Sequence, residues 1–102
     1  MKHLILITHT DAQQDLTDQL RNMDQVSGFT FSHVEGHGLE AEDDPFLSAR
    51  DKVVGYTPRL RVDILLEEKE VDLVLNALRT SNSITQGQGI YWVTAVEKSG
   101  RL

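Results

Sequence analysis

Apolar residues in this chain change their spacing several times, and the order of those changes restricts the fold more than any other feature of the sequence. Alternating apolar residues predict strands, and apolar residues spaced three or four apart predict helices. The strand pattern occurs at residues 3–8, 29–35, 60–66 and 90–96, and the helix pattern at 11–23 and 71–78. The expected order is therefore strand, helix, strand, strand, helix, strand.

This order is typical of an α+β protein with the ferredoxin-like βαββαβ topology. Two right-handed strand-helix-strand units give a four-stranded antiparallel sheet with both helices on one face. The 102 residues suit a single domain, residues 1–102. The helix at 11–23 is expected to begin with a capping box, in which Thr10 and Gln13 cap the first turn.

The second face of such a sheet has no helix to cover it, and an exposed apolar sheet face usually marks an assembly surface. We therefore expect self-association. The side chains expected on this face are Ile5, Ile7, Phe29, Phe31, Tyr91 and Val93, mixed with Arg59, Arg61 and Asp63. Tyr91 and Trp92 are expected to point to opposite faces of the last strand, as packing residues.

Composition excludes several classes of function. The net charge of −6 would repel the phosphates of a nucleic acid. The absence of cysteine excludes disulfides and thiolate metal sites. An apolar run of four residues near the N-terminus is too short for a signal peptide or membrane insertion. We expect a cytoplasmic protein that is not an enzyme, because no residue spacing indicates a catalytic group.

The sequence Gly36-His37-Gly38, after the second expected strand, is the first candidate site. The glycines either allow a positive φ at a plain turn or form part of a ligand site. In the second case His37 would be a metal ligand or an anion contact, because neutral imidazole suits zinc, copper or nickel. His9, before the first helix, is expected at the surface.

Two further elements are candidates for anion binding. Arg59 and Arg61 share one face of a strand, either as a clamp for phosphate or carboxylate or as an ion pair between subunits with Asp63 or Glu35. The sequence Gly87-Gln88-Gly89 either presents backbone N–H groups to an anion or forms a plain turn. The sequence does not identify a cofactor.

Residues 39–57 separate the two halves of the chain. This segment is acidic in its first part, follows no sustained period, and ends at Gly55 and Pro58. We interpret it as a long loop, with one short helical turn around 46–51. Residues 39–45 are expected to be mobile, because they offer little apolar surface to offset the entropy lost on ordering.

Several short motifs resemble the PII signalling proteins. Residues 28–38 are similar to their second strand and its Gly-x-Gly turn before the mobile T-loop, residues 58–62 to the start of their third strand, and residues 87–93 to their glycine-rich turn and fourth strand. A PII-like bacterial family of uncharacterised function resembles the chain more closely, at Ser27–Thr30, Gly36–Gly38, Val53–Gly55 and Tyr91–Thr94. Some members are encoded near heavy-metal efflux systems.

The resemblance implies a homotrimer that senses a small ligand or metal in clefts between subunits and signals to a partner protein, such as a transporter or enzyme, through loop 39–57. The implied ligand site combines residues 36–38, Arg59 or Arg61, and residues 87–89 of a neighbouring chain. PII proteins carry a lysine after the glycine turn, where this chain has Ile90. We therefore expect weak or absent ATP binding. The alternative function is a CutA-like metal-tolerance protein in which His37 and the loop acids buffer a cation.

Overall fold

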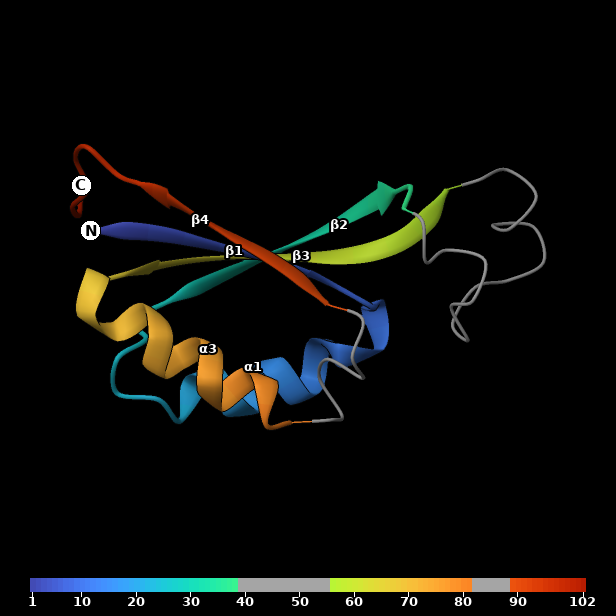
Figure 1. The fold of residues 1–102 in the computed structure, drawn as a ribbon, viewed down its shortest axis with the longest axis horizontal. Coiled ribbons are helices and arrows are strands. Elements are labelled where there is room, and N and C mark those ends of the chain that lie inside the picture. The colour runs from blue at the N-terminus through green and yellow to red at the C-terminus, as the bar shows by residue number, and fades with distance from the viewer. Residues whose placement is uncertain (39–55, 82–88) are drawn as a thin grey trace.

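The computed structural model describes residues 1–38, 56–81 and 89–102. Four strands, two α-helices and two short 3-10 helices form the element order in this part of the chain (Figure 1). The strands are β1 (Lys2–Thr8), β2 (Phe29–Gly36), β3 (Thr57–Leu66) and β4 (Ile90–Ala95). The helical elements are η1 (Thr10–Ala12), α1 (Gln13–Arg21), η3 (Glu68–Glu70) and α3 (Val71–Arg79).

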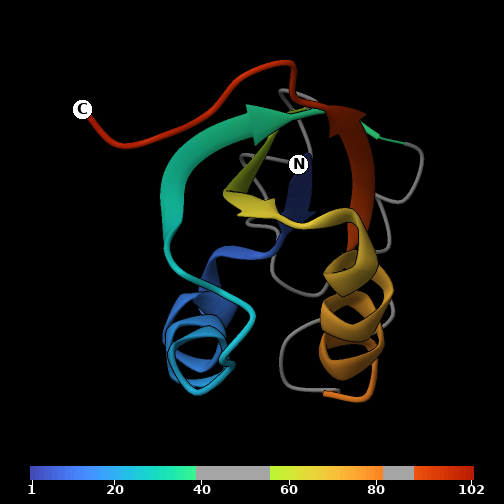
Figure 2. The same cartoon turned by 90° about the vertical axis from the view of Figure 1, so that its left-hand side faces the viewer.

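The strands form one antiparallel sheet in the order β2-β3-β1-β4. Both helices lie on the same face of this sheet, and the opposite face is bare (Figures 1 and 2). The expected ferredoxin-like α+β fold is therefore confirmed. β3 starts at Thr57, inside the segment expected to be loop, and pairs with β2 as far as Gly36.

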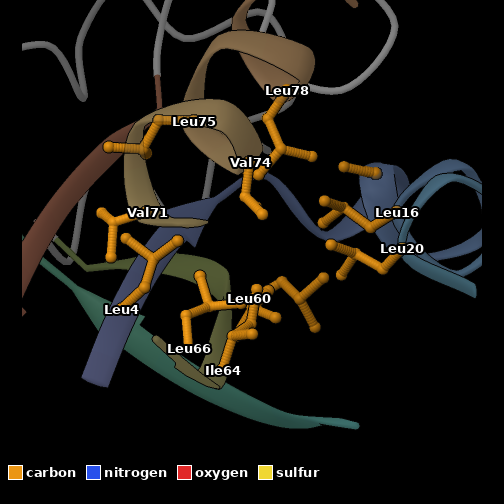
Figure 3. Close-up of a cluster of buried hydrophobic side chains, with 12 residues drawn as sticks. Leu4, Leu16, Leu20, Leu60, Ile64, Leu66, Val71, Val74, Leu75 and Leu78 are labelled. Atoms are coloured by element: carbon orange, nitrogen blue, oxygen red, sulfur yellow. The ribbon is translucent and has the colours of Figure 1, made fainter. Parts of the chain in front are cut away.

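Alternation in β3 fixes which sheet face holds the core. Leu60, Val62, Ile64 and Leu66 are at most 1% exposed and point toward the helices. The helices contribute the matching apolar side chains, which are Leu16 and Leu20 of α1 and Val71, Val74, Leu75 and Leu78 of α3 (Figure 3). Each helix thus buries a stripe of residues three or four positions apart, as an amphipathic helix does.

The cross-strand register corrects the expected composition of the bare face. Phe29 pairs with Ile64 and Phe31 with Val62, so both aromatic rings lie on the helix face and pack against the core. They contact each other edge to face at a centroid distance of 5.4 Å. Tyr91 and Val93 pair with Leu6 and Leu4, which places them on the helix face as well. The sequence prediction was wrong for these four residues. Alternation shows which residues of a strand share a face, but only the pairing with the next strand decides which face of the sheet that is.

The bare face contains Ile5, Ile7, Arg59, Arg61 and Asp63, as expected. Trp92 and Ile90 occupy the same face in β4, since they pair with Ile5 and Ile7. Trp92 and Tyr91 therefore point to opposite faces, as expected. Ile5 is 1% exposed although no helix lies over it, because the register places it between Asp63 and Trp92.

The start of the first helix differs from the expected capping box. A 3-10 turn, η1, precedes α1, and no side chain caps either helical element. The amide of Ala12 instead donates to the carbonyl of His9 at 3.2 Å. This turn draws His9 inward, where it is 3% exposed, so its expected surface position was wrong.

Two sequence interpretations fall outside the described residues. These are the conformation and mobility of the loop at 39–55, including the turn at 46–51, and the placement of Gly87 and Gln88. No helix in the described residues is long and apolar enough to cross a membrane.

The core predicts a strong stability difference between two leucines. Leu60→Ala should lower the free energy of unfolding by about 2–5 kcal/mol, because it opens a cavity in the centre of the sheet. Leu73→Ala, on the exposed side of α3, should change it by less than about 0.5 kcal/mol. Leu60 is 0% exposed and Leu73 is 48% exposed. Urea unfolding at one fixed protein concentration measures both values, and equal losses would contradict this assignment of the core.

Candidate functional site

The predicted ligand residues that the structure describes all lie near one end of the sheet. This end is formed by the last residues of β1 and β2 and the first residues of β3 and β4 (Figure 1). Gly36 ends β2, His37 and Gly38 follow it, and both Arg59 and Gly89 are close to the same end. The fold therefore aligns these segments although they are far apart in the sequence.

Within one chain, however, these segments occupy opposite edges of the sheet. Gly36 and His37 belong to the β2 edge, whereas Gly89 precedes β4 at the other edge. Three inter-strand spacings separate β2 from β4, which corresponds to roughly 14 Å. Gly36–Gly38 and Gly89 therefore do not form one site within a single chain.

The β2 edge brings a glycine and an arginine together. Gly36 pairs with Thr57, and a Cβ atom added at Gly36 would lie 3.8 Å from the Cγ atom of Arg59. His37 and Gly38 are exposed. Neither glycine has a φ in the left-handed range, so the expectation of a positive φ was wrong here. Among the described residues, neither backbone conformation nor close packing requires glycine at these two positions.

The β4 edge places Gly89 against the end of β1. A Cβ atom at Gly89 would lie 3.7 Å from the carbonyl oxygen of Ile7 and 3.9 Å from the hydroxyl oxygen of Thr8. These are ordinary contact distances, so Gly89 is packed beside β1 without strain. Ile90, which follows it, is 59% exposed.

Arg61 is held by an ion pair in its own chain. Its Nη2 atom donates to Oδ1 of Asp63 at 3.0 Å, and its Nε atom lies 3.2 Å from both carboxylate oxygens. The two side chains share a sheet face because they are two residues apart on β3. Asp63 was one of the two partners that the ion-pair interpretation offered, but the pair forms within one chain and not between subunits. Because Arg61 is engaged with Asp63, the structure does not assemble the two arginines into a clamp.

His3 completes a polar row that sequence reasoning did not identify. His3 lies on β1, the strand next to β3, and its Nε2 atom is 2.8 Å from Oδ1 of Asp63. The row His3-Asp63-Arg61 therefore crosses the bare face from β1 to β3. A hollow of mixed character lies beside it, lined by His3, Asp63 and residues 27–30 among others. The register of β1 against β3, which no local pattern specifies, brings these residues together.

The row alters the acidity of its carboxyl group. The hydrogen bonds from Arg61 hold the pKa of Asp63 below its usual value, and His3 makes a smaller contribution in the same direction. Partial burial of the carboxyl group acts in the opposite direction and limits the lowering of this pKa. The same contact raises the pKa of Arg61. Asp63 is therefore an anion at neutral pH, and its carboxylate already accepts hydrogen bonds from Arg61 and His3.

No metal centre is formed by the residues that the structure describes. In residues 1–38, 56–81 and 89–102, no three His, Asp or Glu side chains come close enough to share an ion. His37 is exposed at the loop base, and the acidic part of the loop lies outside the described residues.

The lowered pKa of Asp63 gives a testable pH dependence. Its ionised form stabilises the fold above the usual aspartate pKa of about 4, and this contribution is lost as the pH falls through the lower pKa of the folded state. Carbon-detected NMR titration should place the Asp63 midpoint below the usual value, and Arg61→Gln should raise it. Arg59→Gln is the matched control and should leave the midpoint unchanged. An unshifted midpoint in the parent chain would contradict the ion pair.

Comparisons with known proteins agree with this fold. No curated protein sequence matches the chain. A solved crystal structure of a DUF3240 family protein from Shewanella baltica superposes with a TM-score of 0.78, at 22% sequence identity, over 99% of this chain and 94% of that one. The model of the DUF3240 family, described as proteins of unknown function, matches residues 1–102. The chain therefore belongs to the DUF3240 family.

Proposed function

We propose that this chain is a PII-like regulatory protein whose copies form a closed ring, with a small-ligand site between neighbouring subunits. The observation that carries the proposal is the position of the predicted ligand segments. They lie at the same end of the sheet but on opposite edges, with roughly 14 Å between the edges. One chain cannot complete the site, whereas the β2 edge of one copy and the β4 edge of the next can.

A ring is the simplest assembly that joins two different edges. A contact between unlike surfaces of identical chains is heterologous, and it closes into a ring when the rotation permits. Three copies is the number that the PII resemblance implies. The bare sheet face would then turn toward the other copies, where the exposed apolar side chains Leu65, Ile90 and Trp92 lose contact with water.

The glycines of the candidate site support a partner outside the single chain. Gly36 and Gly38 adopt conformations that any residue can adopt, and nothing described within 3.4 Å would meet an added Cβ atom. A glycine permits the close approach of a ligand or of another backbone. In the proposed ring, that approaching group is the ligand or the next subunit at Gly89.

The ligand in this proposal is an anion smaller than a nucleoside triphosphate. Arg59 lies beside Gly36 and His37 follows Gly36 directly, so these two side chains would make the main contacts with the anion. Ile90 supplies no charge after Gly89. Binding would be signalled to a partner protein through the 39–57 segment, as the PII resemblance implies, which is an established type of switch. The protein would act in the cytoplasm.

Engineered cysteines test the ring directly, because the chain contains no cysteine. The double variant His37→Cys/Gly89→Cys cannot form an internal disulfide, since the two sites are roughly 14 Å apart and a disulfide needs Cα atoms within about 7 Å. Mild oxidation should therefore give a covalent trimer on a non-reducing gel.

The matched control is Leu73→Cys/Gly89→Cys, which moves one thiol to the exposed side of α3 and should stay monomeric on the gel. Light scattering should give a trimer for the parent chain, and Trp92→Glu should dissociate it while Leu73→Glu should not. A parent chain that is monomeric at micromolar concentration would overturn the ring.

Calorimetry separates the two functions that the sequence suggested. With ATP as the titrant, we expect a dissociation constant weaker than about 1 mM, because no cation follows Gly89 to bind the triphosphate. The variant Ile90→Lys should strengthen ATP binding at least about tenfold, since a charge-assisted hydrogen bond contributes about 1.5–3 kcal/mol. Tight Zn²⁺ binding that is lost in His37→Ala would instead favour the metal-buffer function.

A further inference from the structure

A cavity of about 300 Å³ lies on the helix side of the sheet, between the two helices and the first residues of β4. Its walls are mainly apolar, and they come from both helices and both adjacent strands. The apolar lining residues on the helix side include Leu6, Leu16, Leu75 and Leu78. The cavity shares Gly89 with the candidate site but is otherwise separate from it, because it is formed within one chain.

The polar groups of this cavity are few and lie together. Arg79, the last residue of α3, places its guanidinium 5.1 Å from the centroid of the Tyr91 ring, and its Nη2 atom donates to the Tyr91 hydroxyl at 2.7 Å. The ring and the hydroxyl hold the cation at the border of an apolar space. An apolar cavity with a few fixed polar groups is the usual form of a small-molecule site.

The guanidinium keeps donors available for an anion. An arginine has five N–H donors, and among the described residues one of them is given to Tyr91. No acidic side chain is among the described residues that line the cavity. The charge of this described lining is therefore positive, although the chain as a whole carries −6. A carboxylate can accept two parallel hydrogen bonds from an arginine, which fixes its orientation as well as its affinity.

We propose that this cavity binds a small monocarboxylate with an apolar chain or ring. The apolar part lies among the leucines of α1 and α3, and the carboxylate accepts hydrogen bonds from Arg79 and from the Tyr91 hydroxyl. The volume is at the lower end of the range for ligand sites, so it suits a short acid better than a long-chain lipid. The cavity needs no second subunit, so the ring can fail its test without affecting this site.

Hexanoate is a suitable probe, titrated into the full-length chain and followed by ¹H–¹⁵N NMR. We expect saturable shifts at the amides of Leu75, Arg79 and Tyr91. 1-Hexanol has the same chain without the charge, and it should bind at least about threefold more weakly. Shifts that are absent, or that occur only at residues distant from the cavity, would overturn the proposal.

A matched pair of arginine variants tests the cation. Arg79→Gln should weaken hexanoate binding about fivefold and leave hexanol binding unchanged. Arg21→Gln is the control, because Arg21 ends α1 as Arg79 ends α3 but does not line this cavity. Tyr91→Phe keeps the ring, removes the hydroxyl, and should weaken hexanoate about twofold. Equal hexanoate affinity in Arg79→Gln and Arg21→Gln would show that the cation does not bind the acid, and would overturn the proposal.

Discussion

The packing of two helices against one face of the sheet is the interaction on which the rest of this structure depends. β3 supplies four side chains to this layer, and each is at most 1% exposed. Because strand side chains alternate, burying one face of β3 commits Arg59, Arg61 and Asp63 to the other face. The polar row on the bare face is thus a geometric consequence of the core on the opposite side.

The same two-layer construction leaves β2 and β4 as the edges of the sheet. β2 is tied to the core through Phe29 and Phe31, whereas every residue of β4 is exposed. An edge strand with exposed apolar side chains is a ready surface for association. β4 is therefore the strand with the least buried surface in a single chain, and it is one of the two edges that the proposed ring uses. It also forms one wall of the apolar cavity beside Arg79.

The two proposed binding sites differ in what they require from the fold. The inter-subunit site depends on the end of the sheet, where loop bases and glycines meet only if edges from two copies come together. The cavity depends on the spacing between α3 and β4, with Arg79 at a helix end and Tyr91 in the adjacent strand. An anion is the expected ligand in both cases, although the chain as a whole is acidic, because local cations and not net charge decide what a pocket binds.

The sequence by itself determined the element order, the fold class and the alternation of β3, because these depend on residue spacing along one segment. It also placed Ile5, Ile7 and the β3 charges on the bare face. Only the tertiary structure decided the phase of β2 and β4, which moved Phe29 and Tyr91 to the helix face. It also brought His3 to Asp63 and Arg79 to Tyr91. The first pair depends on the register of β1 against β3, and the second on the position of α3 over the sheet. The packing of the whole core sets the register and the helix position, so no local sequence pattern predicts either pair.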